Sequence, residues 1–74
     1  MNKSSQPNFQ ISLAAARVNA GYTQGDVAKM LHVSNKTINN WENGKVSPSF
    51  ANVEMLCRIY GLSSDYIFLP TKST

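Results

Sequence analysis

The stretch Thr23–Gly44, TQGDVAKMLHVSNKTINNWENG, decides how this chain folds. It contains two short helix patterns separated by a turn of three or four residues. Thr23 begins the first pattern as an N-cap, and Asp26 three residues later completes a capping box. Apolar residues follow at helical spacing along one face, namely Val27, Ala28 and Leu31. We therefore expect a first short helix that ends at Leu31.

The turn and the second helix follow directly. His32 stands where a left-handed residue, usually glycine, would close the first helix, and histidine tolerates positive φ better than most residues. Ser34 is the expected N-cap of the second helix, and Gly44 is its expected end. Ile38 and Trp41 lie three residues apart and should face inward, because residues at this spacing share one face of a helix.

The opposite side of this second helix is rich in asparagine. It carries a set that we call the amide face: Asn35, Lys36, Asn39, Asn40 and Asn43. Asparagine is a poor residue for a helix interior because its side chain competes for backbone hydrogen bonds. Its amide can, however, donate to and accept from adenine at the same time in the major groove of DNA. The amide face therefore indicates base reading, with Lys36 contacting guanine or phosphate, and a simple solvated surface is the alternative.

Polar segments next to these helices are candidates for phosphate contacts. Thr23 and Gln24 begin the first helix of the stretch, where free N–H groups and the helix dipole favour an anion. The second helix is followed by a polar loop that contains Asn43, Lys45 and Ser47. Both segments can flank a groove that the second helix enters. The alternative for each is an ordinary cap or loop.

The rest of the chain predicts three more helices and no strand. These helices are expected at Ile11–Ala20, from Ser47 or Ser49 to Gly61, and from Ser63 or Ser64 to about Leu69. The sequence thus predicts an all-α domain of five helices at residues 9–70, preceded by a flexible arm at 1–8 and followed by a tail at 71–74. Cys57 occupies one of the regularly spaced apolar positions of the helix that is expected to end at Gly61, so we expect it in the core.

One charged pair can be linked across this fold. Arg17 follows the apolar face of the first helix of the chain, and Glu42 follows Trp41 near the end of the third. A partly buried pair between them would brace the third helix, and two independent surface charges are the alternative.

The composition of the 74 residues excludes several classes of protein. The formal charge of +3 and the pI near 9.3 lean mildly toward a polyanionic partner. One cysteine and one histidine exclude an internal disulfide and the Cys/His zinc sites. No export signal, membrane-spanning stretch, catalytic constellation or glycine-rich phosphate loop is present. We therefore expect a cytoplasmic protein that is not an enzyme and uses no metal, cofactor or small-molecule substrate.

Taken together, these residues resemble a known family. The resemblance rests on Arg17, Gly21–Gln24, Val27–Ala28, Val33–Ser34, Thr37–Ile38, Trp41–Gly44, Ser47–Pro48 and Tyr60–Tyr66. In this set the chain is similar, over about residues 11 to 69, to the Cro/CI-type helix-turn-helix family, also called the XRE family of phage and bacterial repressors. The resemblance implies a five-helix, lambda-repressor-like DNA-binding domain whose second and third helices form the motif.

The resemblance also implies roles for individual positions. Base contacts are implied for Gln24, Ser34, Asn35, Lys36, Asn39 and Asn40. Phosphate contacts are implied for Thr37, Asn43 and Lys45, and a bracing ion pair for Arg17 and Glu42. The chain departs from the family pattern at His32, which replaces the common turn glycine, and in the loop after Gly44, which is less basic than in many relatives.

The resulting functional prediction is a sequence-specific regulator of transcription, a repressor, that occupies a near-palindromic site on double-stranded DNA. Two copies would pair weakly on DNA through the loop Val46–Ser49 and the segment that holds Tyr66, Phe68 and Leu69. The alternative is a protein-interaction module, such as an antitoxin-like partner of another protein. The exposed asparagines count against it, because the centres of protein interfaces favour aromatic residues, Met and Arg.

Overall fold

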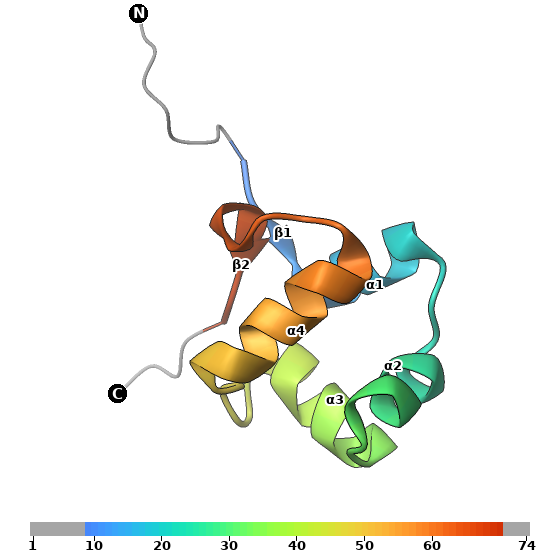
Figure 1. Ribbon diagram of the computed structural model, residues 1–74. Coiled ribbons are helices and arrows are strands. Elements are labelled where there is room, and N and C mark those ends of the chain that lie inside the picture. Colours follow the sequence, from blue (N-terminus) through green and yellow to red (C-terminus); the bar gives the residue numbers. More distant parts are fainter. Residues whose placement is uncertain (1–8, 71–74) are drawn as a thin grey trace, which may run out of the picture.

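The computed structural model describes residues 9–70, which form four α-helices, one 3-10 turn and two very short strands (Figure 1). The predicted arm at 1–8 and tail at 71–74 lie outside the described residues. In chain order the elements are β1 (Ile11–Ser12), α1 (Leu13–Ala20), α2 (Gln24–Leu31), α3 (Asn35–Asn43), α4 (Phe50–Tyr60), the 3-10 turn η1 (Ser64–Tyr66) and β2 (Ile67–Phe68). The all-α class predicted from the sequence is confirmed.

Both ends of each α-helix follow from local sequence. Each α-helix has a hydroxyl side chain as its N-cap, which accepts a hydrogen bond from the backbone N–H of the third helical residue. The four N-caps are Ser12, Thr23, Ser34 and Ser49. A left-handed residue ends each helix, at Gly21, His32, Gly44 and Gly61. These signals leave little freedom in where the helices start and stop. The bounds of α2 and α3 are accordingly those that the sequence predicted, and α4 starts from Ser49.

A single apolar core holds the helices together. It consists of Leu13, Ala16, Val27, Ala28, Ile38, Trp41, Val53, Leu56, Cys57, Tyr60 and Ile67. α2 packs against α3 and α1 packs against α4, so the α2–α3 pair forms one end of the molecule (Figure 1). Cys57 lies in the core as expected, and burial raises the pKa of its thiol.

The prediction for the start of the first helix was wrong by two residues. Ile11 and Ser12 form β1, which pairs in parallel with β2, and α1 begins only at Leu13. Ser12 is the cap of α1, with its side chain accepting from the backbone N–H of Ala15 at 3.0 Å. A cap residue has an extended backbone, so it is able to complete a strand immediately before the helix.

The prediction of a fifth helix reaching Leu69 was also wrong. Only Ser64–Tyr66 is helical, as one 3-10 turn, and the chain then extends as β2. Ile67 is buried and pairs with Ile11, while the ring of Tyr66 stacks at a tilt against Phe9 with centroids 5.8 Å apart. These contacts join segments more than fifty residues apart, so a local sequence pattern cannot predict them.

Within residues 9–70, no helix combines the length and the apolar character that a membrane span requires. The same part of the chain contains no group of three or more His, Cys, Asp or Glu side chains placed to hold a metal ion.

Candidate nucleic-acid interface

The turn between α2 and α3 is tight and fully specified by its hydrogen bonds. His32 adopts the predicted left-handed conformation, with φ 59° and ψ 44°, and its backbone N–H bonds to the carbonyl of Lys29 at 3.3 Å. The next N–H, that of Val33, bonds to the carbonyl of Ala28 at 3.0 Å. Val27 and Ala28 of α2 and Ile38 of α3 are buried in the common core, and α2 packs against α3. Hydrogen bonds and the packing of α2 on α3 therefore close the turn, although it lacks the common glycine.

α3 divides into a buried and an exposed side, as its sequence predicted. Ile38 and Trp41 are buried, with 1% and 5% of their surface exposed. The amide face lies on the other side: Asn35, Lys36, Asn39 and Asn43 are exposed, and Asn40 is half-buried. The side-chain amide of Asn43 donates to the side-chain oxygen of Asn39 at 2.9 Å, a bond typical of residues four apart on a helix.

The start of α2 adjoins the start of the amide face. A Cβ placed on Gly25 would lie 3.5 Å from the side-chain oxygen of Asn35, so the two helices meet here without a side chain between them. The predicted capping box is present: the N–H of Asp26 bonds to the hydroxyl of Thr23, and the carboxylate of Asp26 accepts from the N–H of Thr23. Within residues 9–70, the N–H groups of Gln24 and Gly25 have no hydrogen-bond acceptor. They remain available to an anion.

Asp26 places a negative charge beside these free N–H groups. Hydrogen bonds from the backbone and the side chain of Thr23 lower the pKa of the Asp26 carboxyl, so it is ionised at neutral pH. The sequence prediction treated Asp26 only as part of a cap. Its position three residues after Thr23 was a sufficient signal that its charge would lie at this surface.

Hydroxyl groups at the start of α3 are bonded to each other. The hydroxyl of Ser34 accepts from the backbone N–H of Thr37 at 3.1 Å and lies 3.0 Å from the hydroxyl of Thr37. Both residues are thus oriented by the cap itself. Lys45 and Ser47, the remaining predicted contact residues, are exposed in the loop after α3. The N–H of Lys45 bonds to the carbonyl of Asn40 at 2.9 Å, which ties this loop to the last turn of α3.

Arg17 and Glu42 form the ion pair that the sequence suggested. The Arg17 Nε donates to one carboxylate oxygen of Glu42 at 2.7 Å and its Nη2 donates to the other at 3.2 Å. The Arg17 Nη1 donates to the carbonyl of Tyr22 at 3.0 Å, so the same side chain also holds the segment before α2. The hydrogen bonds and charge of Glu42 raise the pKa of Arg17 above its ordinary value, against the opposing effect of burial.

A third side chain joins this pair, which sequence reasoning missed. The side-chain amide of Gln24 donates to the Glu42 carboxylate at 2.9 Å. We call these three residues the Glu42 network: Arg17, Gln24 and Glu42. Tyr60 lies close enough to respond to it. Burial, with a smaller contribution from the charge of Glu42, raises the pKa of Tyr60 to about 12. The network links α1, α2 and α3, and only the pairing of helices in space reveals that Gln24 belongs to it.

Comparisons with known proteins agree with this geometry. The family model described as helix-turn-helix matches residues 13–67. The chain is also 34% identical over 55 residues to the HTH-type transcriptional regulator ImmR of Bacillus subtilis (strain 168), an alignment that covers 74% of this chain and 43% of the relative. The chain therefore belongs to the XRE-type helix-turn-helix family. Over residues 13–67, membership supports the DNA-binding domain of a transcription regulator rather than an enzyme. It spans less than half the length of ImmR.

Proposed function

We propose that this protein is a sequence-specific regulator of transcription in which α2 and α3 form the helix-turn-helix motif and α3 enters the major groove of double-stranded DNA. It acts in the cytoplasm as a repressor by occupying a near-palindromic operator. Residues 9–70 are the DNA-binding domain in this proposal. The observation that carries it is the division of α3, whose amide face is turned outward while Ile38 and Trp41 anchor the helix in the core.

The proposal assigns two kinds of DNA contact. Base edges are read by Gln24, Ser34, Asn35, Lys36, Asn39 and Asn40, and phosphates are held by Thr23, Thr37, Asn43, Lys45 and Ser47. Support comes from the adjacency of Gly25 and Asn35, because it brings the free N–H groups of α2 next to the first residue of the amide face. An α3 lying in the groove would therefore have phosphate donors at its N-terminal side from α2 and at its C-terminal side from the Lys45 loop.

Weak pairing of two copies on DNA is part of the proposal. Val46, Phe50 and Phe68 are 51%, 78% and 52% exposed, although they are apolar. Pro70 lies against Gly44: a Cβ added to Gly44 would be 3.0 Å from the Cβ of Pro70. The end of the described chain therefore borders the loop after α3. Sedimentation should show monomers at low micromolar concentration and two copies per palindromic duplex. A stable dimer without DNA would contradict this part of the proposal.

The test of the proposed function is selection of bound duplexes from a random pool, followed by binding at several salt concentrations. Selection should enrich a near-palindrome with half-sites about one helical turn apart. If about four to six phosphates are neutralised per half-site, the logarithm of the affinity should fall with that of the salt concentration at a slope near −4 to −5. No enrichment together with a flat salt response, and co-purification of another protein, would favour the interaction module instead.

A further inference from the structure

One member of the Glu42 network, Gln24, is also a proposed DNA contact. Only 5% of the Glu42 side-chain surface is exposed. Its carboxylate accepts two hydrogen bonds from Arg17 and one, at 2.9 Å, from the amide nitrogen of Gln24. Gln24 is the first residue of α2 and is half-buried, and within residues 9–70 its side chain makes no hydrogen bond besides the one to Glu42.

The chemistry of the carboxylate fixes which way round the Gln24 amide lies. A carboxylate can only accept hydrogen bonds, whereas a carboxamide has a donor end and an acceptor end. Gln24 must therefore turn its nitrogen toward Glu42, and its oxygen then faces away. Arg17 holds the carboxylate by two parallel bonds, a geometry that leaves little rotational freedom.

We propose that Glu42 is a positioning residue for DNA recognition, which fixes the Gln24 amide so that its oxygen points to the DNA as an acceptor. The inference rests on the proposed function. A phosphate has no hydrogen to donate, so the outward oxygen selects a base that does. In the major groove these are the exocyclic amino groups of adenine and cytosine. Within residues 9–70 the second N–H of the amide has no hydrogen-bond partner, so it can donate to a neighbouring acceptor.

A purely structural role for Glu42 makes a different prediction. If the carboxylate serves only to neutralise Arg17, then breaking the pair from either side should weaken the fold and leave the Gln24 contact alone. Arg17→Lys is the matched control, because it removes the two parallel bonds but keeps a cation beside Glu42 and the acceptor for Gln24. Glu42→Gln keeps the shape and allows the Gln24 amide to lie either way round. Glu42→Asp keeps the charge but withdraws it from Gln24, and serves where the first variant folds poorly.

The first experiment needs no DNA. In the free protein labelled with nitrogen-15, the Gln24 side-chain amide should give resonances shifted from those of solvated glutamine and slowed exchange with water. Arg17→Lys should keep this signature, and Glu42→Gln and Glu42→Asp should lose it. A Gln24 amide that resembles solvated glutamine in the wild-type protein would overturn the inference, whatever the DNA experiments give.

The second experiment is a double-mutant cycle on the duplex selected by the wild-type protein, at a temperature where every variant is folded. Gln24→Ala should weaken binding about tenfold, and Glu42→Gln should weaken it nearly as much. In the Gln24→Ala background Glu42→Gln should cost less than about twofold, whereas Arg17→Lys should cost the same in both backgrounds. Additive effects for Glu42→Gln would overturn the inference while the proposed function stands. Failure of the wild-type protein to select any duplex would overturn the proposed function, and with it the role of Gln24 at DNA.

Discussion

Two polar regions border α3, and the protein satisfies their hydrogen bonds to different degrees. In the Glu42 network the carboxylate takes up donors from α1 and α2, and the residues are half-buried or nearly buried. On the amide face only the bond between Asn43 and Asn39 joins two side chains among residues 9–70, and the amides of Asn35 and Asn40 have no such partner there.

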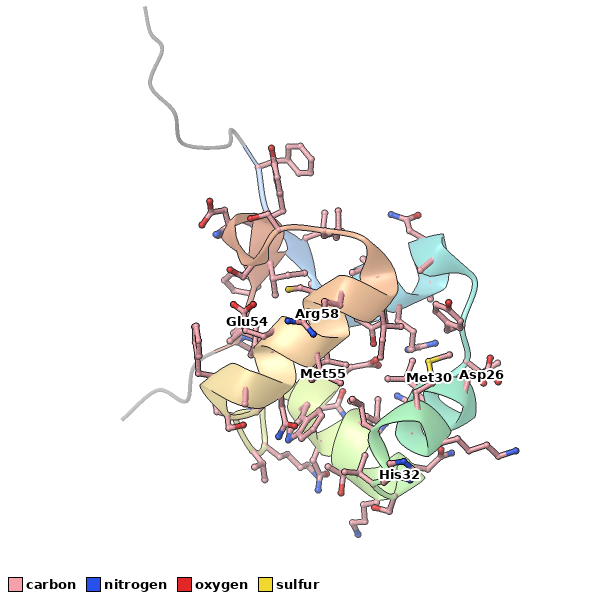
Figure 2. The ribbon with its side chains drawn as sticks, viewed as in Figure 1. Asp26, Met30, His32, Glu54, Met55 and Arg58 are labelled. Carbon is pink, nitrogen blue, oxygen red and sulfur yellow. The ribbon has the colours of Figure 1, made fainter. Side chains whose placement is uncertain are left out.

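This difference separates a region that organises the protein from one that is left for a ligand. Buried polar groups need partners because an unsatisfied one costs about 1–3 kcal/mol, whereas exposed amides exchange water for a ligand without that loss. Figure 2 shows the side chains of α2 and α3 projecting outward near His32, at the end of the molecule away from β1 and β2. Substitutions on the amide face should therefore affect mainly DNA binding, whereas loss of Arg17 from the Glu42 network should affect mainly stability.

The largest expected effect is loss of stability in the Glu42 network. Arg17→Ala leaves the nearly buried Glu42 carboxylate without its cation, which should lower the free energy of unfolding by about 3–5 kcal/mol. Urea unfolding followed by the fluorescence of Trp41 measures this. Arg58→Ala, at an exposed position on α4, is the control and should change stability by less than about 0.5 kcal/mol. Equal losses in both variants would mean that the Glu42 network contributes no special stability.

The amide face should show the reverse pattern. Asn35→Ala or Asn40→Ala should weaken binding to the selected duplex by about 1–3 kcal/mol and relax the preference at one base pair. Stability should stay within about 0.5 kcal/mol, since alanine is the better helix former. Anisotropy titrations on the selected and on scrambled duplexes measure the effect, with Asn19→Ala on α1 as control. Unchanged affinity in both variants would mean that the amide face is not the reader.

Titration of Tyr60 reports from the buried side of the Glu42 network. Its folded-state pKa of about 12 lies above its ordinary value of about 10, so the folded protein holds the phenolic proton over a range where the unfolded chain has lost it. The contribution to stability is complete below about pH 10 and is lost as the pH rises to about 12. The urea midpoint should therefore fall over this range, and less steeply in Tyr60→Phe. Parallel curves for the two proteins would contradict the raised pKa.

The smallest predicted effect lies where the two regions meet, at the start of α2. Asp26→Asn keeps an oxygen that can accept from the N–H of Thr23 but removes a charge next to the free N–H groups of Gln24 and Gly25. Binding to DNA should become about two- to threefold tighter at low salt, and the gain should shrink as salt is added. An unchanged affinity at low salt would mean that no phosphate approaches this end of α2.

The part of the fold that the sequence predicted is the part that local signals determine. Thr23, Ser34 and Gly44 fixed the ends of α2 and α3, because caps act within four residues of the chain. The pairing of Ile11 with Ile67 could not be predicted in this way. This pairing depends on the position and direction of the chain after α4. In addition, a strand of two residues is too short to show an alternating pattern.

In the candidate site, too, features set by local spacing were predicted, whereas contacts between distant residues were not. The exposure of Asn35 and Asn39 followed from helical spacing against Ile38 and Trp41. The bond from Gln24 to Glu42 did not, since their separation of eighteen residues carries no periodic signal and only the packing of α2 on α3 brings them together. The roles of these residues at DNA remain predictions.

The most direct test of the account is to follow the side-chain amide resonances of the protein while the selected duplex is added. We predict that the amides of Asn35, Asn39 and Asn40 shift strongly and in proportion to the bound fraction, whereas the exposed amide of Asn19 on α1 stays in place. Strong shifts at Asn19 together with unmoved amides on α3 would contradict the claim that α3 reads the DNA.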